Sequence, residues 1–367
     1  MAATRRSRRW LVPVTAVAVV AGVGALGPVV ADASPDLPGI TAQDLLAKVQ
    51  TAKVDGLSGT VRSATDLGLP ALPGVDGANQ LPDLLTGEHT ARVAFAGPDK
   101  ARVSVLDDMA ERVLTSDGKT AWAYDSAKRE AVKFTLPARP AAPEVAPEKQ
   151  AYDPQEVAKK FLAAIDPSTA VDVTGTESVA GRDAYKLRLV PKTDKTTVGS
   201  VTLAVDAKTW VPLQVTVLPR TGKDPAVQVG FESVSFDVPA ASTFAFTPPK
   251  GVKVTEKTAP AITPKKHDTP KALPKADPKK KPAASDRPTV VGEGWESVAV
   301  LRGVKLPAGN GPLNQLLANA RTVQGPWGSG KILTSKMVSA LVTDDGRVLV
   351  GFVTADTLAA AAPLAPR

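Results

Sequence analysis

Three short stretches of the chain spell motifs of nucleotide or acyl-transfer chemistry. Gly22 to Gly27 spells GxGxxG, but no strand precedes it, as a dinucleotide site requires. Gly325 to Lys331 spells most of a phosphate-binding loop, yet Ile332 stands where a hydroxyl group would hold magnesium. Ser116 to Lys119 spells SxxK, but Asp117-Gly118 is a hairpin signal, whereas such a serine nucleophile must open a helix. None of these stretches predicts catalysis.

Side chains for acid–base or metal chemistry are also few. The chain has no cysteine, and its histidines are His89 and His267, the second of which lies in a Pro- and Lys-rich stretch. This inventory removes disulfides, thiol nucleophiles and His-rich metal sites. The acidic pairs Asp107-Asp108 and Asp344-Asp345 fall at turns, where carboxylates accept hydrogen bonds from backbone amides. We therefore expect neither an enzyme nor a bound cofactor or metal.

Apolar residues at alternate positions are the most regular pattern in the chain. They predict strands from Val201 to Gly251 and five short strands from Thr90 to Leu136. Further strands are predicted at 57–65, 171–179 and 184–190. Period-two alternation is typical of strands with one buried and one solvated face, and the short polar turns between them favour antiparallel hairpins. The pattern predicts one sheet of roughly eleven strands, which is large enough to curl.

Two amphipathic helices are predicted to shield the apolar face of this sheet. Thr41 to Lys53 places Leu45, Leu46 and Val49 at helical spacing, with Thr41 as the N-cap. Pro154 to Ile165 makes a second apolar stripe. Helices packed into the concave side of a curled sheet would cover its apolar residues.

The stretch from Asp66 to Leu85 is rich in proline and glycine and yet apolar. Exposed leucines are unusual in a long loop, because loops normally carry polar residues that solvate the backbone. We interpret the stretch either as a lid over the mouth of a cavity or as a loop packed on the sheet edge. The candidate lid residues are Leu67, Leu69, Leu72, Leu84 and Leu85.

The strand-forming stretches also carry a family resemblance. VDAKTWVPLQVTV, VGFESVSFDV and FAFTPPKGV follow one another, and TSDGKTAWAYD lies upstream. Over roughly Ile40 to Val254 this order resembles the LolA/LppX-type lipoprotein carrier superfamily. The resemblance implies an α+β fold, in which a curved antiparallel sheet forms an incomplete β-barrel around helices and holds acyl chains in an apolar cavity. It therefore implies a non-enzymatic lipid- or lipoprotein-binding protein.

The residues expected to line such a cavity lie on the apolar side of the strands. An acyl chain has no polar group to recognise, so a dry concave wall is enough, and each buried methylene contributes about 0.8 kcal/mol. Each residue could equally belong to an ordinary core. The candidate wall residues are Phe95, Val105, Trp122, Phe134, Leu189, Leu203 and Leu213.

The N-terminus predicts the compartment. Four arginines between Arg5 and Arg9 precede an apolar run from Trp10 to Val30, and Ala31-Asp32-Ala33 follows as a small-residue cleavage pattern. Residues 1–33 are therefore predicted to be an export signal. The apolar run is about one bilayer span long, so an uncleaved anchor is the alternative. In both cases we expect an extracytoplasmic protein, either secreted or membrane-associated.

The charge distribution separates the remaining domains. Of the formal net charge of +8, residues 1–33 carry +3 and 257–287 carry +6, so the rest of the chain is close to neutral at −1. A nucleic-acid partner is therefore not expected. The predicted domains are a LolA-like carrier domain (34–257), a Pro/Lys-rich linker (258–289) and a small α+β C-terminal domain (290–367).

The C-terminal domain suggests a second function. Its predicted elements are a strand from Trp295 to Leu301, a helix from Pro312 to Ala320, a hairpin of 338–342 with 348–353, and a helix from Thr354 to Ala361. A carrier domain followed by a smaller domain that begins with Gly294-Trp295 resembles the layout of the RseB/MucB regulators. This resemblance implies an extracytoplasmic regulator that senses lipoproteins or lipids and binds a membrane anti-sigma factor. For a carrier, the corresponding partner would be a lipid transporter.

Overall fold

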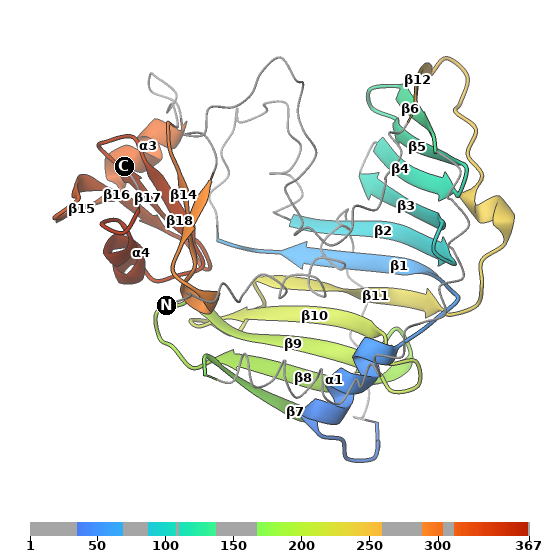
Figure 1. Ribbon diagram of the computed structural model, residues 1–367, viewed down its shortest axis with the longest axis horizontal. Helices are drawn as coiled ribbons and strands as arrows, with labels where there is room; N and C mark the ends of the chain where they lie inside the picture. Colours follow the sequence, from blue (N-terminus) through green and yellow to red (C-terminus); the bar gives the residue numbers. More distant parts are fainter. Residues whose placement is uncertain are drawn as a thin grey trace, which may run out of the picture.

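The structure is a computed structural model that describes residues 35–68, 87–107, 110–136, 167–258, 288–303 and 312–365. Within these residues the chain forms one sheet of twelve strands and a second sheet of six strands (Figure 1). The larger sheet is curved, and its two end strands do not pair with each other, so it does not close into a barrel. The predicted fold class, with a small C-terminal unit beside the large sheet, is confirmed. The predicted export signal, the helix at 154–165 and residues 259–287 of the predicted linker lie outside the described residues.

The large sheet has the strand order β12-β6-β5-β4-β3-β2-β1-β11-β10-β9-β8-β7. Its strands are β1 (Gly56–Thr65), β2 (Gly87–Ala96), β3 (Lys100–Asp107), β4 (Ala110–Asp117), β5 (Thr120–Asp125), β6 (Glu130–Thr135), β7 (Thr169–Val179), β8 (Arg182–Pro191), β9 (Val198–Asp206), β10 (Pro212–Pro219), β11 (Val227–Ser235) and β12 (Lys253–Thr258). All neighbours are antiparallel except β12, which runs parallel to β6.

The twelfth strand accounts for the difference from the roughly eleven expected. Every residue of β12 is exposed, so this edge strand carries no alternating apolar signal. Two salt bridges hold it to β6, between Lys253 and Glu130 (3.1 Å) and between Lys133 and Glu256 (2.9 Å). Charged side chains of this kind are typical of protected sheet edges.

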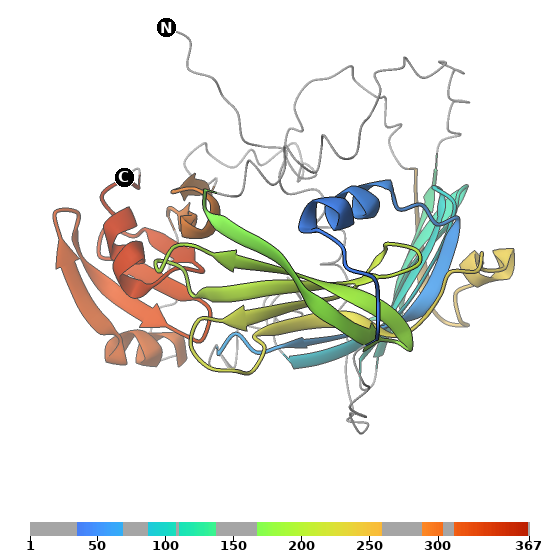
Figure 2. The same cartoon turned by 90° about the horizontal axis from the view of Figure 1, so that it is seen from below.

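Strand β1 lies in the middle of the sheet and joins two meanders. One is β2 to β6, and the other is β7 to β11, which reaches β1 through the β1–β11 pair. Figure 2 shows that the sheet bends, with β2 to β6 rising on the side where α1 lies. The two halves therefore form one continuous curved surface around that side.

Helix α1 (Ala42–Thr51) packs on β7 to β9. Leu45 is fully buried and packs with Tyr185, Leu187 and Val205. Thr41 caps the helix, because its hydroxyl accepts a hydrogen bond from the Asp44 amide. The predicted helix and cap are thus confirmed. We call the side of the sheet that α1 contacts the helix face, and the other side the opposite face.

The second sheet has the order β13-β14-β18-β17-β16-β15. Its elements are β13 (Thr289–Val291), β14 (Val298–Leu301), α3 (Pro312–Asn319), β15 (Arg321–Gly325), β16 (Gly328–Thr334), β17 (Ser339–Thr343), β18 (Val348–Gly351) and α4 (Ala355–Ala361). Helix α4 covers the face that carries Val298, Val300, Leu341 and Leu349. The predicted β17–β18 hairpin and the helix predicted from Thr354 to Ala361 are confirmed, and Thr354 is the N-cap of that helix.

Two details of the C-terminal unit differ from the sequence prediction. The strand expected to start at Trp295 starts at Val298, because Gly294–Glu296 forms a 3₁₀ turn, η4. The phosphate-loop-like stretch from Gly325 lies in the β15–β16 hairpin, which alternation did not predict because most of β15 is exposed. Trp327 is buried at the turn of this hairpin.

The two sheets meet in a junction that contains both apolar and polar contacts. Leu67, Val198, Ala226 and Met337 form its buried cluster, which we call the junction cluster. The indole of Trp295 donates a hydrogen bond to the Thr169 hydroxyl (2.8 Å). None of the described helices is long and apolar enough to cross a membrane.

Candidate functional site

A row of side chains on the helix face runs from β9 to β6, and in β2 to β6 all five of its members are apolar. The row can be followed through the strand register, because directly paired residues share a face. Leu203 on β9 packs against α1, and it pairs with Val215, which pairs with Val229, which pairs with Ser63 on β1. Gly59, which has the same parity as Ser63 on β1, then pairs with Val93. From there the row continues through Val103, Leu114, Ala123 and Val132.

These residues form a surface that protein side chains only partly cover. None of the five from Val93 to Val132 is fully buried, and Leu114 in the middle of the row is 54% exposed. The next row adds Phe95 on β2 and Phe134 on β6, and Val105 lies on the same face of β3. We call this set the apolar patch. Its members are Val93, Phe95, Val103, Val105, Leu114, Ala123, Val132 and Phe134.

Charged residues border the apolar patch on the same face. Val105 pairs with Arg112, which pairs with Asp125, which pairs with Glu130. Burial alone would raise the pKa of Asp125, but hydrogen bonds from Lys128 and the nearby Arg112 charge outweigh it and hold the pKa below its ordinary value. The patch therefore has an apolar centre and an ionised rim.

The opposite face of the same strands carries both polar and apolar side chains, among them Val113, which pairs with Ser104. Arg92 on β2 pairs with Ser104 on β3, and Arg102 pairs with Thr115 on β4. The charged side chains Arg92 and Arg102 thus distinguish this side of β2 and β3 from the apolar patch.

Five of the predicted wall residues lie on the helix face. Phe95, Val105 and Phe134 belong to the apolar patch. Leu189 and Leu203 pack against the buried cluster that includes Leu45 of α1. Whether any of them contacts a ligand stays a prediction.

The other two predicted wall residues lie elsewhere. Trp122 pairs with Thr115 and Lys133 on the opposite face, and its ring centre lies 5.5 Å from that of Phe246. Leu213 is buried at a bulge of β10, in a cluster with Val179, Ala184 and Ala204. The seven residues therefore do not form one wall. Alternation within a strand shows which residues share a side, but it does not fix the phase between one strand and the next.

Of the predicted lid residues, the structure describes Leu67 alone. Leu67 is buried in the junction cluster, where its carbonyl oxygen accepts hydrogen bonds from the Ser335 hydroxyl (2.7 Å) and the Met337 amide (3.3 Å). Leu69, Leu72, Leu84 and Leu85 lie outside the described residues. Leu67 thus connects this stretch to the second sheet.

Of the stretches that resemble catalytic motifs, Ser116 to Lys119 and Gly325 to Lys331 lie at hairpins, and Gly22 to Gly27 lies outside the described residues. Ser116 to Lys119 spans the β4–β5 turn, where the carboxylate of Asp117 accepts hydrogen bonds from the amides of Lys119 and Thr120. These bonds hold the pKa of Asp117 below its ordinary value. Over the described part of the chain, no three His, Cys, Asp or Glu side chains come together as a metal site.

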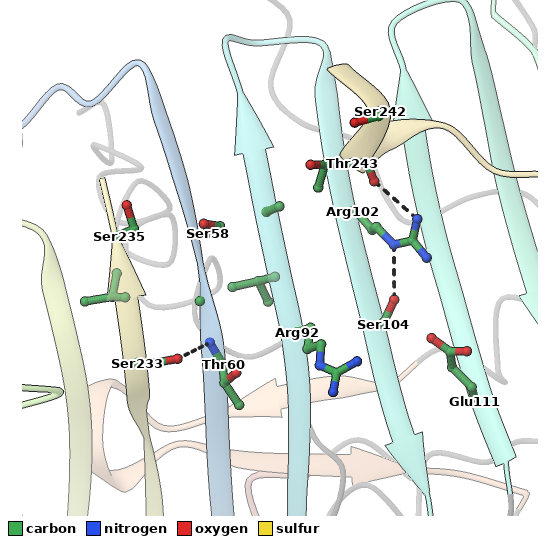
Figure 3. A pocket seen from close by; sticks show the side chains of 14 residues that line it. Ser58, Thr60, Arg92, Arg102, Ser104, Glu111, Ser233, Ser235, Ser242 and Thr243 are labelled. Carbon is green, nitrogen blue, oxygen red and sulfur yellow. Dashed lines mark hydrogen bonds between the residues drawn. The ribbon is translucent and has the colours of Figure 1, made fainter. Parts of the chain in front are cut away.

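A hollow of about 680 Å³ lies on the opposite face, and sequence reasoning missed it (Figure 3). Strands β11, β1, β2, β3 and β4 form its floor, and the 3₁₀ turn η2 (Ala241–Phe244) forms one side. Polar side chains at alternate positions are what any solvated strand face shows, so the sequence gives no sign of a concave site. Its polar lining residues are Ser58, Thr60, Arg92, Arg102, Ser104, Glu111, Ser233, Ser235, Ser242 and Thr243.

No protein-family model matches the chain, and no curated protein matches it. Among solved structures, it is similar to the MucA/MucB complex of Pseudomonas aeruginosa, at 16% identity over 88% of this chain and 96% of that one, with a TM-score of 0.41. It is similar to a structure of MucB at 18% identity, over 86% and 94% of the two chains, with a TM-score of 0.36. A LolA superfamily protein of Nitrosomonas europaea matches at 15% identity, over 57% and 99%, with a TM-score of 0.21. The chain is thus similar to the two kinds of protein that its sequence resembles.

Proposed function

We propose that the apolar patch binds acyl chains, and that the protein is an exported, non-enzymatic carrier of a lipid or lipoprotein. The observation that carries the proposal is Leu114, which is 54% exposed in the middle of an apolar row five strands wide. A single exposed leucine is ordinary on a protein surface. A contiguous apolar surface on one side of a sheet, with charges at its border, is typical of a binding site.

The size and chemistry of the apolar patch suit an acyl chain. Burial of about ten methylenes at about 0.8 kcal/mol each gives useful affinity before the cost of ordering the ligand. Valine, leucine and phenylalanine side chains provide such contacts without any polar group to satisfy. Arg112 and Asp125, at the border of the patch, are placed to meet a polar headgroup.

The second sheet supports an alternative function, in which the protein senses a bound lipid or lipoprotein and does not transport it. On its face away from the α4 core, paired residues form another apolar row, Val290–Ala299–Val350–Ala340–Leu333, and Val290 is 68% exposed. A partner protein could cover this row. The second candidate is therefore an extracytoplasmic regulator that binds lipids or lipoproteins on the large sheet and a membrane anti-sigma factor on the small one.

A substitution in the apolar patch tests the first candidate. Leu114→Asp places a charge where the acyl chain would lie, and we expect at least a tenfold loss of affinity for a fluorescent fatty acid. The matched control is Thr135→Asp, an exposed position of β6 on the opposite face. Both positions are exposed, so both variants should stay folded. Equal affinity in the two variants would contradict the proposal.

The two candidates are separated by Val290→Asp. In a regulator, this substitution would weaken capture of the anti-sigma factor and leave fatty-acid affinity unchanged, because Val290 and the apolar patch lie on different sheets. Isothermal titration with the purified periplasmic or extracellular segment of the anti-sigma factor measures the effect. If no such segment binds, the carrier is retained and the regulator is rejected.

A further inference from the structure

The hollow on the opposite face contains two charged side chains that have no hydrogen-bond or ion-pair partner within the described residues. Arg92 is exposed on β2, and within the described residues its guanidinium has neither a hydrogen-bond nor an ion-pair partner. The carboxylate of Glu111, which is half-buried on β4, has no partner among them either. Figure 3 shows Arg92, Arg102 and Glu111 around the same hollow. Ionised groups in a concave surface are available for a ligand.

Arg102 is held in one orientation beside them. Its Nε donates a hydrogen bond to the Ser104 hydroxyl (3.3 Å), and its Nη1 donates to the carbonyl oxygens of Thr243 (3.2 Å) and Ala245 (3.3 Å). These bonds tie β3 to η2 and fix the guanidinium plane. No hydrogen bond within the described structure uses Nη2, so this end of the fork remains for a ligand.

We infer that this hollow binds a phosphorylated polyol, such as a glycerol-phosphate group. The anionic part follows from the two arginines. Arg102 pairs with Ala94, two residues along β2 from Arg92, so the two side chains are diagonal neighbours on one face, with Cα atoms roughly 7–8 Å apart. Two guanidinium groups so placed can donate to one phosphate, whose geometry suits their planar forks.

The polyol part follows from the remaining lining. Within the described residues, the hydroxyls of Ser58, Thr60 and Ser242 make no hydrogen bond, so each can donate to or accept from a ligand hydroxyl. The carboxylate of Glu111 is an acceptor only, and it would repel a bare anion but bind the hydroxyl of a polyol. The arrangement therefore favours a ligand that is anionic at one end and hydroxylated at the other.

This site is independent of the proposed acyl-chain site. The two use opposite sides of the same strands; Val93 of the apolar patch also lines the hollow, but Arg92, Arg102 and Glu111 belong to the hollow and not to the patch. A single carboxylate and two arginines within a nearly neutral domain also do not suit a nucleic acid, which needs an extended basic surface. Failure of either proposal leaves the other unaffected.

Calorimetric titration of the full chain with sn-glycerol 3-phosphate tests the inference. We expect saturable binding, about tenfold tighter than that of inorganic phosphate, and at least a tenfold loss in Arg92→Gln. Arg188→Gln is the matched control. Arg188 is an exposed arginine of β8 on the opposite face, the side of the sheet that carries the hollow, but it does not line the hollow. This variant should bind as the unmodified chain does. Glu111→Gln should reduce the difference in affinity between sn-glycerol 3-phosphate and inorganic phosphate.

The inference is overturned if the chain shows no saturable binding, or if Arg188→Gln weakens binding as much as Arg92→Gln does. Vesicles of phosphatidylglycerol in phosphatidylcholine then identify the source of the group. Vesicle binding that glycerol 3-phosphate competes away, and that Arg92→Gln abolishes, assigns the site to a lipid headgroup. If glycerol 3-phosphate binds and the vesicles do not, the ligand is a soluble phosphate ester. Both results retain the binding chemistry.

Discussion

Asp206 stabilises the turn between β9 and β10 through an ion pair that the sequence did not reveal. Its carboxylate is 1% exposed and accepts hydrogen bonds from Arg182 Nε (2.6 Å) and Nη2 (3.0 Å), from both the amide and the hydroxyl of Thr209, and from the amide of Lys208. Burial alone would raise the pKa of Asp206. The bonds from Arg182 and Thr209 outweigh it, so the pKa lies below the ordinary value of 3.8.

The lowered pKa of Asp206 determines how its contribution to stability changes with pH. Because the folded pKa lies below the unfolded one, the ionised carboxylate contributes its full stability above about pH 4, and the contribution is lost as the pH falls through the folded pKa. We expect Asp206→Asn to lower the free energy of unfolding by about 3 kcal/mol at pH 7. The difference should shrink below about pH 4.

Urea unfolding at pH 7 and at pH 3 measures both quantities. The control is Asp172→Asn, an exposed residue of β7 that has no ion pair within the described structure. It should change stability by less than about 0.5 kcal/mol at either pH. A gap between Asp206→Asn and the unmodified chain that stays constant with pH would show that the ion pair is not its cause.

Residue types in the sequence predicted turns better than they predicted partners. Short polar turns were predicted between the strands from Val201 to Gly251, and Asp206 lies in one of them. Its pairing with Arg182, 24 residues earlier, has no local signal. Long-range pairing also decides on which side of the sheet Trp122 lies. Its parity within β5 was clear from the sequence, but its side depends on the register with β4 and β6.

At the scale of elements, α1 is the clearest test of how the helix face is covered. Leu45 is fully buried against the β7–β9 cluster, whereas Thr41 only satisfies the first turn of the helix. Leu45→Ala should therefore lower the free energy of unfolding by about 2–5 kcal/mol, and Thr41→Ala by about 1 kcal/mol. Denaturant unfolding measures the two values. The reverse order would mean that α1 is not packed on the sheet as described.

The elements that the sequence predicted share strong local signals. The α1 cap and spacing, the β17–β18 hairpin and the meander from β2 to β6 all combine alternation or helical spacing with specific turn residues. The elements that it missed, β12, β13 and the β15–β16 hairpin, are short or largely exposed. Tertiary pairing stabilises such strands, so their own residues carry little pattern.

At the scale of the whole molecule, the junction cluster determines whether the two sheets act together. Met337 comes from the second unit and is 2% exposed against Leu67, Val198 and Ala226 of the first. Lys336 beside it forms a salt bridge with Asp66 (3.0 Å), whose hydrogen bond holds the pKa of Asp66 below its ordinary value. The sequence predicted two domains but gave no sign of this contact, because it joins residues far apart in the chain.

Met337→Ala should loosen the junction without unfolding either core. We expect a cost of about 2–5 kcal/mol to the transition that breaks the junction. Calorimetric unfolding should then show two separated transitions where the unmodified chain shows coupled ones. Val290→Ala, at an exposed position of β13, is the control and should leave the profile unchanged. Identical profiles for Met337→Ala and the unmodified chain would show that the units do not depend on this contact.

Native mass spectrometry with organic extraction tests whether the apolar patch holds acyl chains. The chain would be exported and purified from its own host without detergent. We predict a bound lipid at near-stoichiometric level in the unmodified chain and its loss in Leu114→Asp. An apo mass for the unmodified chain, unchanged after incubation with lipids, would contradict the claim.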